Sequence, residues 1–146
     1  MYGNIDEYIR LVIRKYWVDK NDVKDTSCDP TLIKLNISNP DIIIDENYSS
    51  DEITVLYYTK ILTTDEVAEY VDNIQIDPSV NNIYDIQETT GPDGYKEITT
   101  KRKYDGMKAW VEIEADGVQS NNAAAAIHST WGVTPTIVDG VITEIN

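Results

Sequence analysis

The sequence predicts a single α+β domain over residues 1–146, built from a mainly antiparallel sheet with two amphipathic helices packed on one side. Three observations predict this class: glycine turns that frame three strands, apolar stripes at helical spacing, and a second hairpin signal near the end of the chain. The segments are residues 83–115 for the three strands, about 4–17 and 63–74 for the helices, and 136–145 for the hairpin.

Two turns join the strands of the predicted meander. The first is Gly91-Pro92-Asp93-Gly94, which favours a type I turn closed by a glycine bulge, and the second is Asp105-Gly106, typical of a two-residue hairpin. These loop lengths predict a register. It sets Tyr84 opposite Arg102, Asp85 opposite Lys101, Ile86 opposite Thr100, Thr100 opposite Val111 and Ile98 opposite Ile113. One face is then apolar and the other polar.

The two predicted helices rest on apolar spacing and on capping residues. In 4–17, Asn4 is a candidate N-cap, and basic residues gather toward the end, as the helix dipole favours. Its apolar stripe comprises Ile5, Ile9, Val12, Ile13 and Tyr16. In 63–74, Thr63 and Glu66 have the spacing of a capping box.

The rest of the chain predicts mostly strands. Residues 31–38 alternate, 42–44 form a short apolar run, and 53–62 are apolar on both faces, which indicates a central strand. Residues 123–131 fit either a short helix stopped by Gly132 or an extended strand. The Asp139-Gly140 turn predicts the closing hairpin.

Charge narrows the choice of partners. The 26 acidic and 12 basic residues give a formal net charge of −14. Direct binding to nucleic acid or to an anionic membrane requires positive charge, so we expect neither. No apolar run approaches the roughly 20 residues of a membrane span, and no signal-peptide pattern precedes residue 10. We therefore expect a virion or cytoplasmic protein that is not secreted by a signal peptide.

The residues that usually carry chemistry form no recognisable motif. His128 and Ser129 are adjacent, and neighbouring side chains do not generally meet as nucleophile and base. One histidine and one cysteine, Cys28, cannot complete a structural zinc site. Residues 45–56 alternate oxygen-bearing side chains as a calcium loop does, but lack its glycine at position six and its glutamate at position twelve. We expect no catalytic, cofactor or metal site.

A basic cluster interrupts the acidic chain within the meander. Five of the twelve basic residues lie between Lys96 and Lys108. In the predicted register Lys103 faces Lys108, and four residues share the polar face: Lys101, Lys103, Lys108 and Trp110. Edge lysines that prevent aggregation explain this pattern in one interpretation. In the other, the cluster is a socket for an acidic surface, with Trp110 as its buried anchor and a second copy of the chain as the partner.

These observations favour a non-enzymatic structural or interaction subunit of a larger assembly. Our specific expectation is a bacteriophage virion component, such as a capsid decoration, neck or tail protein, which binds copies of itself and other subunits. The alternative is an acidic inhibitor that mimics nucleic acid in counter-defence. That alternative requires a continuous acidic face, and lysines interrupt the acidic residues along most of the predicted strands.

Overall fold

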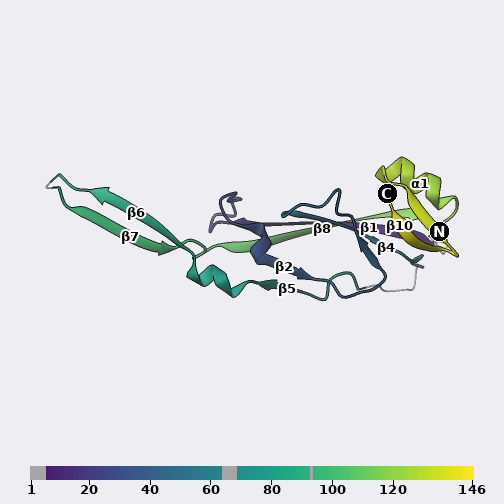
Figure 1. Cartoon of the computed structure of the whole chain (residues 1–146), viewed down its shortest axis with the longest axis horizontal. Coiled ribbons are helices and arrows are strands. Elements are labelled where there is room, and N and C mark those ends of the chain that lie inside the picture. The colour runs from purple at the N-terminus through teal and green to yellow at the C-terminus, as the bar shows by residue number, and fades with distance from the viewer. Residues whose placement is uncertain (1–5, 64–68, 93) are drawn as a thin grey trace.

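The computed structural model describes residues 6–63, 69–92 and 94–146, and these form an elongated, mainly β molecule with an arm projecting from one end (Figure 1). The strands are β1 (Glu7–Val18), β2 (Ile33–Asn36), β3 (Ile42–Ile44), β4 (Ile53–Tyr58), β5 (Asn73–Ile76), β6 (Tyr84–Thr90), β7 (Lys96–Arg102), β8 (Lys108–Gln119), β9 (Pro135–Val138) and β10 (Val141–Ile145). The helices are α1 (Ala123–Trp131) and two short 3₁₀ helices, η1 (Pro30–Leu32) and η2 (Pro78–Asn82). The antiparallel pairing was predicted correctly.

The central sheet has the order β3-β4-β1-β8 and every neighbouring pair in it is antiparallel. β1 and β8 pair along all 12 residues of each strand, from Glu7 opposite Gln119 to Val18 opposite Lys108. β4 lies inside the sheet, which confirms the central strand that was predicted over 53–62. Three two-stranded sheets accompany it: β2–β5, β6–β7 and β9–β10.

The predicted helix over 4–17 is wrong, because residues 7–18 form β1. Residues 1–5 lie outside the described part of the chain. The apolar residues fit a helical stripe, but in the strand they occupy both faces: Leu11 and Ile13 are buried on one, Tyr8 and Val12 on the other. A strand covered on both sides is apolar throughout, and its β-branched and aromatic residues suit that setting. The element is therefore, with β4, one of the two inner strands of the central sheet.

The predicted helix over 63–74 is also wrong where it can be compared. Residues 64–68, which include Glu66 of the expected capping box, lie outside the described residues. Residues 69–72 are not helical, and Asn73 already begins β5. β5 pairs with β2, with Ile74 opposite Leu35. Among the described residues α1 is the one α-helix, so the fold has no pair of helices packed on one side of the sheet.

The meander over 83–115 is half confirmed. β6 and β7 form the predicted hairpin in the predicted register, with Tyr84 opposite Arg102 and Ile86 opposite Thr100. Gly94 takes φ of 82°, as its place in the turn requires. The predicted pairing of the third strand is wrong, because β8 pairs with β1 instead of β7.

The C-terminal elements agree with the sequence. β9 and β10 form the predicted hairpin around Asp139 and Gly140, whose φ angles of 52° and 79° are those of a type I′ turn. Residues 123–131 form a helix, and Gly132 ends it with φ of 73°.

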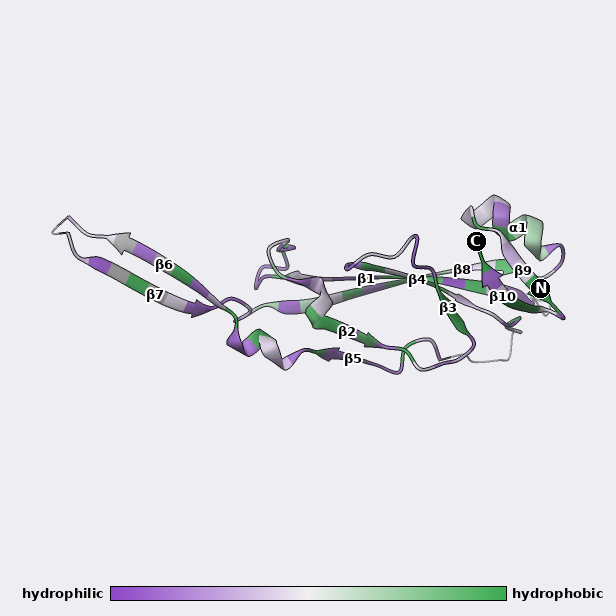
Figure 2. Ribbon diagram, in the orientation of Figure 1, coloured by the Kyte–Doolittle hydropathy of each residue, from purple (hydrophilic) through white to green (hydrophobic). Residues whose placement is uncertain are grey.

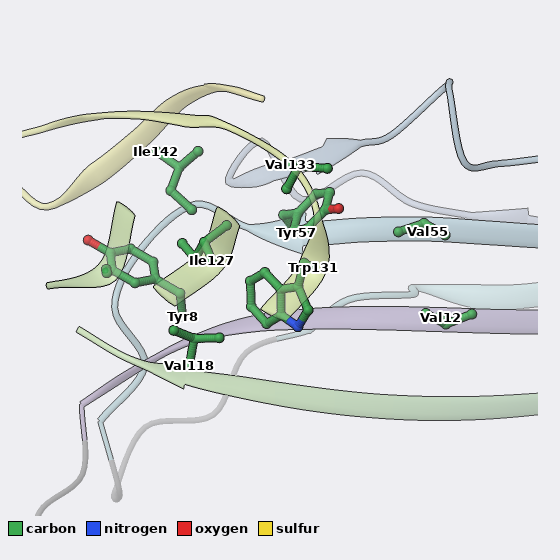
Figure 3. Packing of buried hydrophobic residues seen from close by; sticks show 10 residues of the cluster. Tyr8, Val12, Val55, Tyr57, Val118, Ile127, Trp131, Val133 and Ile142 are labelled. Carbon is green, nitrogen blue, oxygen red and sulfur yellow. The ribbon is translucent and has the colours of Figure 1, made fainter. Parts of the chain in front are cut away.

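One core lies where α1 and the β9–β10 hairpin cover a face of the sheet (Figure 3). Trp131 of α1 packs against Tyr57 of β4, with ring centroids 5.7 Å apart. Ile127 and Ile142 are fully enclosed there, and the Tyr8 hydroxyl donates a hydrogen bond to the Gly140 carbonyl at 2.7 Å. This contact fixes the C-terminal hairpin to β1.

Two further clusters occupy the rest of the body. Leu11, Ile13 and Leu56 form a core on the opposite face of the sheet, against the β2 segment. Near the base of the arm, Trp17 and Tyr104 meet edge to face at 4.9 Å. The Tyr104 hydroxyl accepts a hydrogen bond from the Asp29 amide at 2.8 Å, so the chain leaving β7 is anchored to the body.

Candidate interaction surface

The arm, which we define as β6, β7 and the turn that joins them, extends away from the body at the end opposite α1 (Figure 1). The two strands pack extensively only on one another. The local sequence explains the hairpin, since β-branched residues alternate with polar ones on both sides of a Pro-Asp-Gly turn. Each strand shows one hydrophobic band among hydrophilic and near-neutral ones (Figure 2). The arm is thus formed by local signals and held to the body at its base.

One face of the arm exposes two isoleucines to solvent. Alternation along the paired strands sets both isoleucines on one face together with polar and charged residues: Tyr84, Ile86, Glu88, Thr90, Lys96, Ile98, Thr100 and Arg102. Ile86 is 72% exposed and Ile98 66% exposed, whereas the buried isoleucines of the body are at 2% or less. A two-stranded hairpin is only marginally stable by itself in water. Polar residues in place of the two isoleucines would leave the hairpin pairing unchanged. The exposed isoleucine pair on a projecting element is a candidate interaction surface.

The structure separates the four residues predicted to form one socket. Lys101 lies on the arm opposite Asp85, while Lys108 and Trp110 lie on β8. Lys103 follows β7, and its Nζ donates a hydrogen bond to the Ser27 carbonyl at 2.6 Å. The predicted meeting of Lys103 and Lys108 across two strands is therefore wrong. Pairing β8 with β1 avoids that like-charge contact.

Acidic partners surround most of these lysines. Lys108 forms an ion pair with Asp22 at 3.0 Å. Lys101 and Lys103 line a cleft of about 280 Å³ at the base of the arm, where aspartates outnumber lysines. Its charged residues are Asp19, Lys20, Asp25, Asp85, Lys101, Lys103 and Asp105. The cleft is close to neutral as a whole, so it lacks the strongly basic character that was expected of the cluster.

Trp110 is 42% exposed, and its Nε1 donates a hydrogen bond to Glu112 at 3.1 Å. The same carboxylate oxygen accepts a hydrogen bond from the Tyr16 hydroxyl at 3.2 Å. Desolvation of that hydroxyl, and then its hydrogen bond to Glu112, raises the pKa of Tyr16. Trp110 thus lies on the open face of β1 and β8, with its polar atom satisfied and much of its ring in contact with water.

The sequence reasoning missed the exposed edge of β8. This strand pairs with β1 on one side, and no described strand pairs with its other side. Two ion pairs cross from β1 to β8: Arg10 with Asp116 at 3.0 Å, and Arg14 with Glu114 at 3.2 Å. On the opposite face Ile113 is 58% exposed, although its partner Ile13 is fully buried. The signal was present in the regular alternation of Val111 to Glu114, which the sequence analysis assigned to a pairing with β7.

The side chains that could carry chemistry make structural contacts instead. Burial raises the pKa of the Cys28 thiol, which keeps it protonated and unreactive. The Asp45 carboxylate, the first residue of the considered calcium loop, is buried and accepts hydrogen bonds from the Asn47 amide at 3.0 Å and the Tyr57 hydroxyl at 3.2 Å. His128 lies exposed, with its Nδ1 3.4 Å from the Thr134 hydroxyl.

Within residues 6–63, 69–92 and 94–146, no group of three or more histidine, cysteine, aspartate or glutamate side chains is placed to hold a metal ion. In the same ranges no helix is long and apolar enough to cross a membrane. Comparison with protein-family models, with curated proteins and with solved structures finds no match to this chain.

Proposed function

We propose that this chain is a non-enzymatic structural subunit of a larger assembly, and that the arm is the element by which it holds a neighbouring copy. The observation that carries the proposal is the pair of exposed isoleucines, Ile86 and Ile98, on a hairpin that projects from the body. Apolar side chains on a projecting hairpin gain free energy only when a partner covers them.

The surface area of the chain supports the same proposal. A compact monomer of 16.5 kDa is expected to expose about 7,500 Å². This chain exposes 9591 Å², roughly 2,000 Å² more than that expectation. The excess is as large as the surface buried in a specific protein–protein interface. An elongated subunit with an arm has this extra surface available for its neighbours.

The specific assembly that we propose is a bacteriophage virion, with the chain as a capsid decoration, neck or tail protein. Virions are built from many copies of small subunits, and an arm that holds a neighbour suits repeated addition. The net charge of −14 supports a position away from direct contact with the packaged nucleic acid, because an acidic surface repels phosphates. Its partners are then copies of itself and other virion subunits, with neither nucleic acid nor membrane among them.

An acidic inhibitor that mimics nucleic acid has less support. A mimic must present unpaired carboxylates along one face to attract a basic partner. On the open face of β8, Glu114 and Asp116 are paired with Arg14 and Arg10. These ion pairs reduce the field that such a partner would meet.

The experiment is a solution mass measurement by sedimentation over a wide range of protein concentrations. We expect the wild-type mass to increase with concentration, and to increase more at moderate than at low salt, because salt screens the repulsion between acidic subunits. The variant Ile86→Ser with Ile98→Ser should remain a monomer at concentrations where the wild type associates.

The matched control is Val138→Ser on β9, which also removes an exposed aliphatic side chain, 53% exposed, but far from the arm. It should associate as the wild type does. Circular dichroism establishes that each variant remains folded. A wild type that stays monomeric at every concentration, or an arm variant that associates normally, contradicts the proposal.

A further inference from the structure

Among the described strands, one edge of the arm and one edge of the central sheet are long and unpaired. β7 pairs only with β6, and β8 pairs only with β1. The open edge of β8 extends over 12 residues, and neither strand contains a proline that would block pairing. Such an edge presents a row of free backbone N–H and C=O groups, to which a strand from another molecule adds by ordinary sheet hydrogen bonds. The arm supplies a strand of this kind.

The side chains of β7 and β8 alternate between the two faces of their sheets in a similar way. Ile98 and Lys101 lie on opposite faces of β7, and on β8 Ile113 lies opposite in face to Glu112 and Glu114. Any register that brings Ile98 to the face of Ile113 therefore also brings Lys101 to the face of the two glutamates. One pairing thus brings Ile98 to the face of Ile113 and Lys101 to the face of the glutamates, while Lys96 and Arg102 lie on the face of Ile98.

The charges of the strands favour this pairing over a symmetric one. β7 has three basic residues and one acidic residue, a net charge of +2, whereas β8 has one basic and three acidic residues, a net charge of −2. A two-fold pairing of β8 with the β8 of another copy would bring acidic strands together. Like charges facing across strands destabilise a sheet. Of β7 and β8, each strand carries the net charge opposite to that of the other.

We propose that the outer edge of β7 in one copy pairs with the outer edge of β8 in a second copy, so that the arm extends the four-stranded sheet of its neighbour. This inference rests on the proposed function, because it names the partner surface of the arm. The contact joins two different surfaces, so each copy keeps a free β8 and a free arm. Repetition then closes a ring or extends a filament.

Disulfide cross-linking between two single-cysteine preparations tests the pairing. Both carry Cys28→Ala, which removes the one native cysteine. The first adds Thr100→Cys on the face of Ile98. The second adds one cysteine on β8, either on the face of Ile113 (Val111→Cys, Ile113→Cys or Ala115→Cys) or on the other face (Glu112→Cys or Glu114→Cys). The two are mixed at concentrations where the wild type associates, and then oxidised.

We expect disulfide-linked heterodimers from one of the three β8 cysteines on the face of Ile113, and none from the two on the other face. Only directly opposed residues bring their Cα atoms within the span of a disulfide, so the scan also identifies the register. If Cys28→Ala unfolds the chain, native Cys28 is kept, since its thiol is buried and protonated.

The uncross-linked mass separates the two possible failures. An associated sample that gives only homodimers, only links to the glutamate positions, or no links overturns the β7–β8 pairing and leaves the proposed function standing. A sample that remains monomeric at every concentration overturns the proposed function and the pairing that rests on it.

Discussion

The sharpest test of the fold compares one substitution at two isoleucines. Ile13 of β1 is fully buried and packs with Leu11 and Leu56, whereas Ile98 of the arm is 66% exposed. Truncating a buried isoleucine to alanine removes about 2–3 kcal/mol of apolar burial and leaves a cavity, so we expect Ile13→Ala to lower the free energy of unfolding by about 3–4 kcal/mol. Ile98→Ala removes about a third of that burial, so its cost should be below about 1 kcal/mol.

Urea unfolding followed by circular dichroism measures both free energies. The protein is kept dilute, because association would add to the apparent stability. We expect the same slope of unfolding free energy against urea concentration in both variants, since the surface exposed on unfolding hardly changes. Equal losses in the two variants would refute the reasoning. A large loss at Ile98 would mean that the arm packs on the body, and a small loss at Ile13 would mean that β1 does not form the centre of the sheet.

Two further predictions concern ionisable groups. Burial, with help from the Asp45 carboxylate, raises the pKa of Tyr57 to about 12, so neutral Tyr57 contributes stability below pH 10 that is lost between about pH 10 and 12. Tyr57→Phe should lower stability by about 1–3 kcal/mol at pH 7, because Asp45 loses its hydroxyl donor, and an unchanged urea midpoint would contradict this. Hydrogen bonds from Lys34 and Ser79 lower the pKa of Asp77 to about 2, so its contribution to stability is present above about pH 4 and is lost as the pH falls toward 2. NMR titration should find that low pKa, and Lys34→Ala should move it upward; a normal pKa in the wild type would show that the ion pair does not form.

Local signals predicted the hairpins well. The arm register from Tyr84 to Arg102 and the closing hairpin around Asp139 and Gly140 depend on turn residues that lie beside the strands they join. Turn type and loop length fix the register of a hairpin, so few distant contacts are needed. The same holds for the end of α1 at Gly132.

Partner choice between distant strands was not predictable in this way. Asp105-Gly106 correctly indicated a turn, but β8 pairs with β1 across about 100 residues of chain, as the hydrogen bond from Arg14 to Glu114 shows. β1 itself fits both a helical and a strand pattern. The strand forms because α1 and the C-terminal hairpin cover one of its faces and the β2 segment covers the other.

The candidate site also combines features that the sequence predicted with features that it did not. The basic cluster was visible in the sequence, but the partners of Lys103 and Lys108 are Ser27 and Asp22, which lie 76 and 86 residues away along the chain. Those contacts remove the facing lysines on which the predicted socket depended. The open edge of β8 emerges only when β1 is known to be its partner, because an edge is a property of the whole sheet.

Hydrogen exchange measured by mass spectrometry, on dilute and on associated protein, tests most directly whether the arm is the assembly element. In dilute solution the arm amides should exchange fast, since an isolated hairpin is marginally stable, while those of β1 stay protected. On association the account predicts new protection in β6, β7 and β8, with little change in α1 and β9. Association that leaves exchange in the arm unchanged would contradict it.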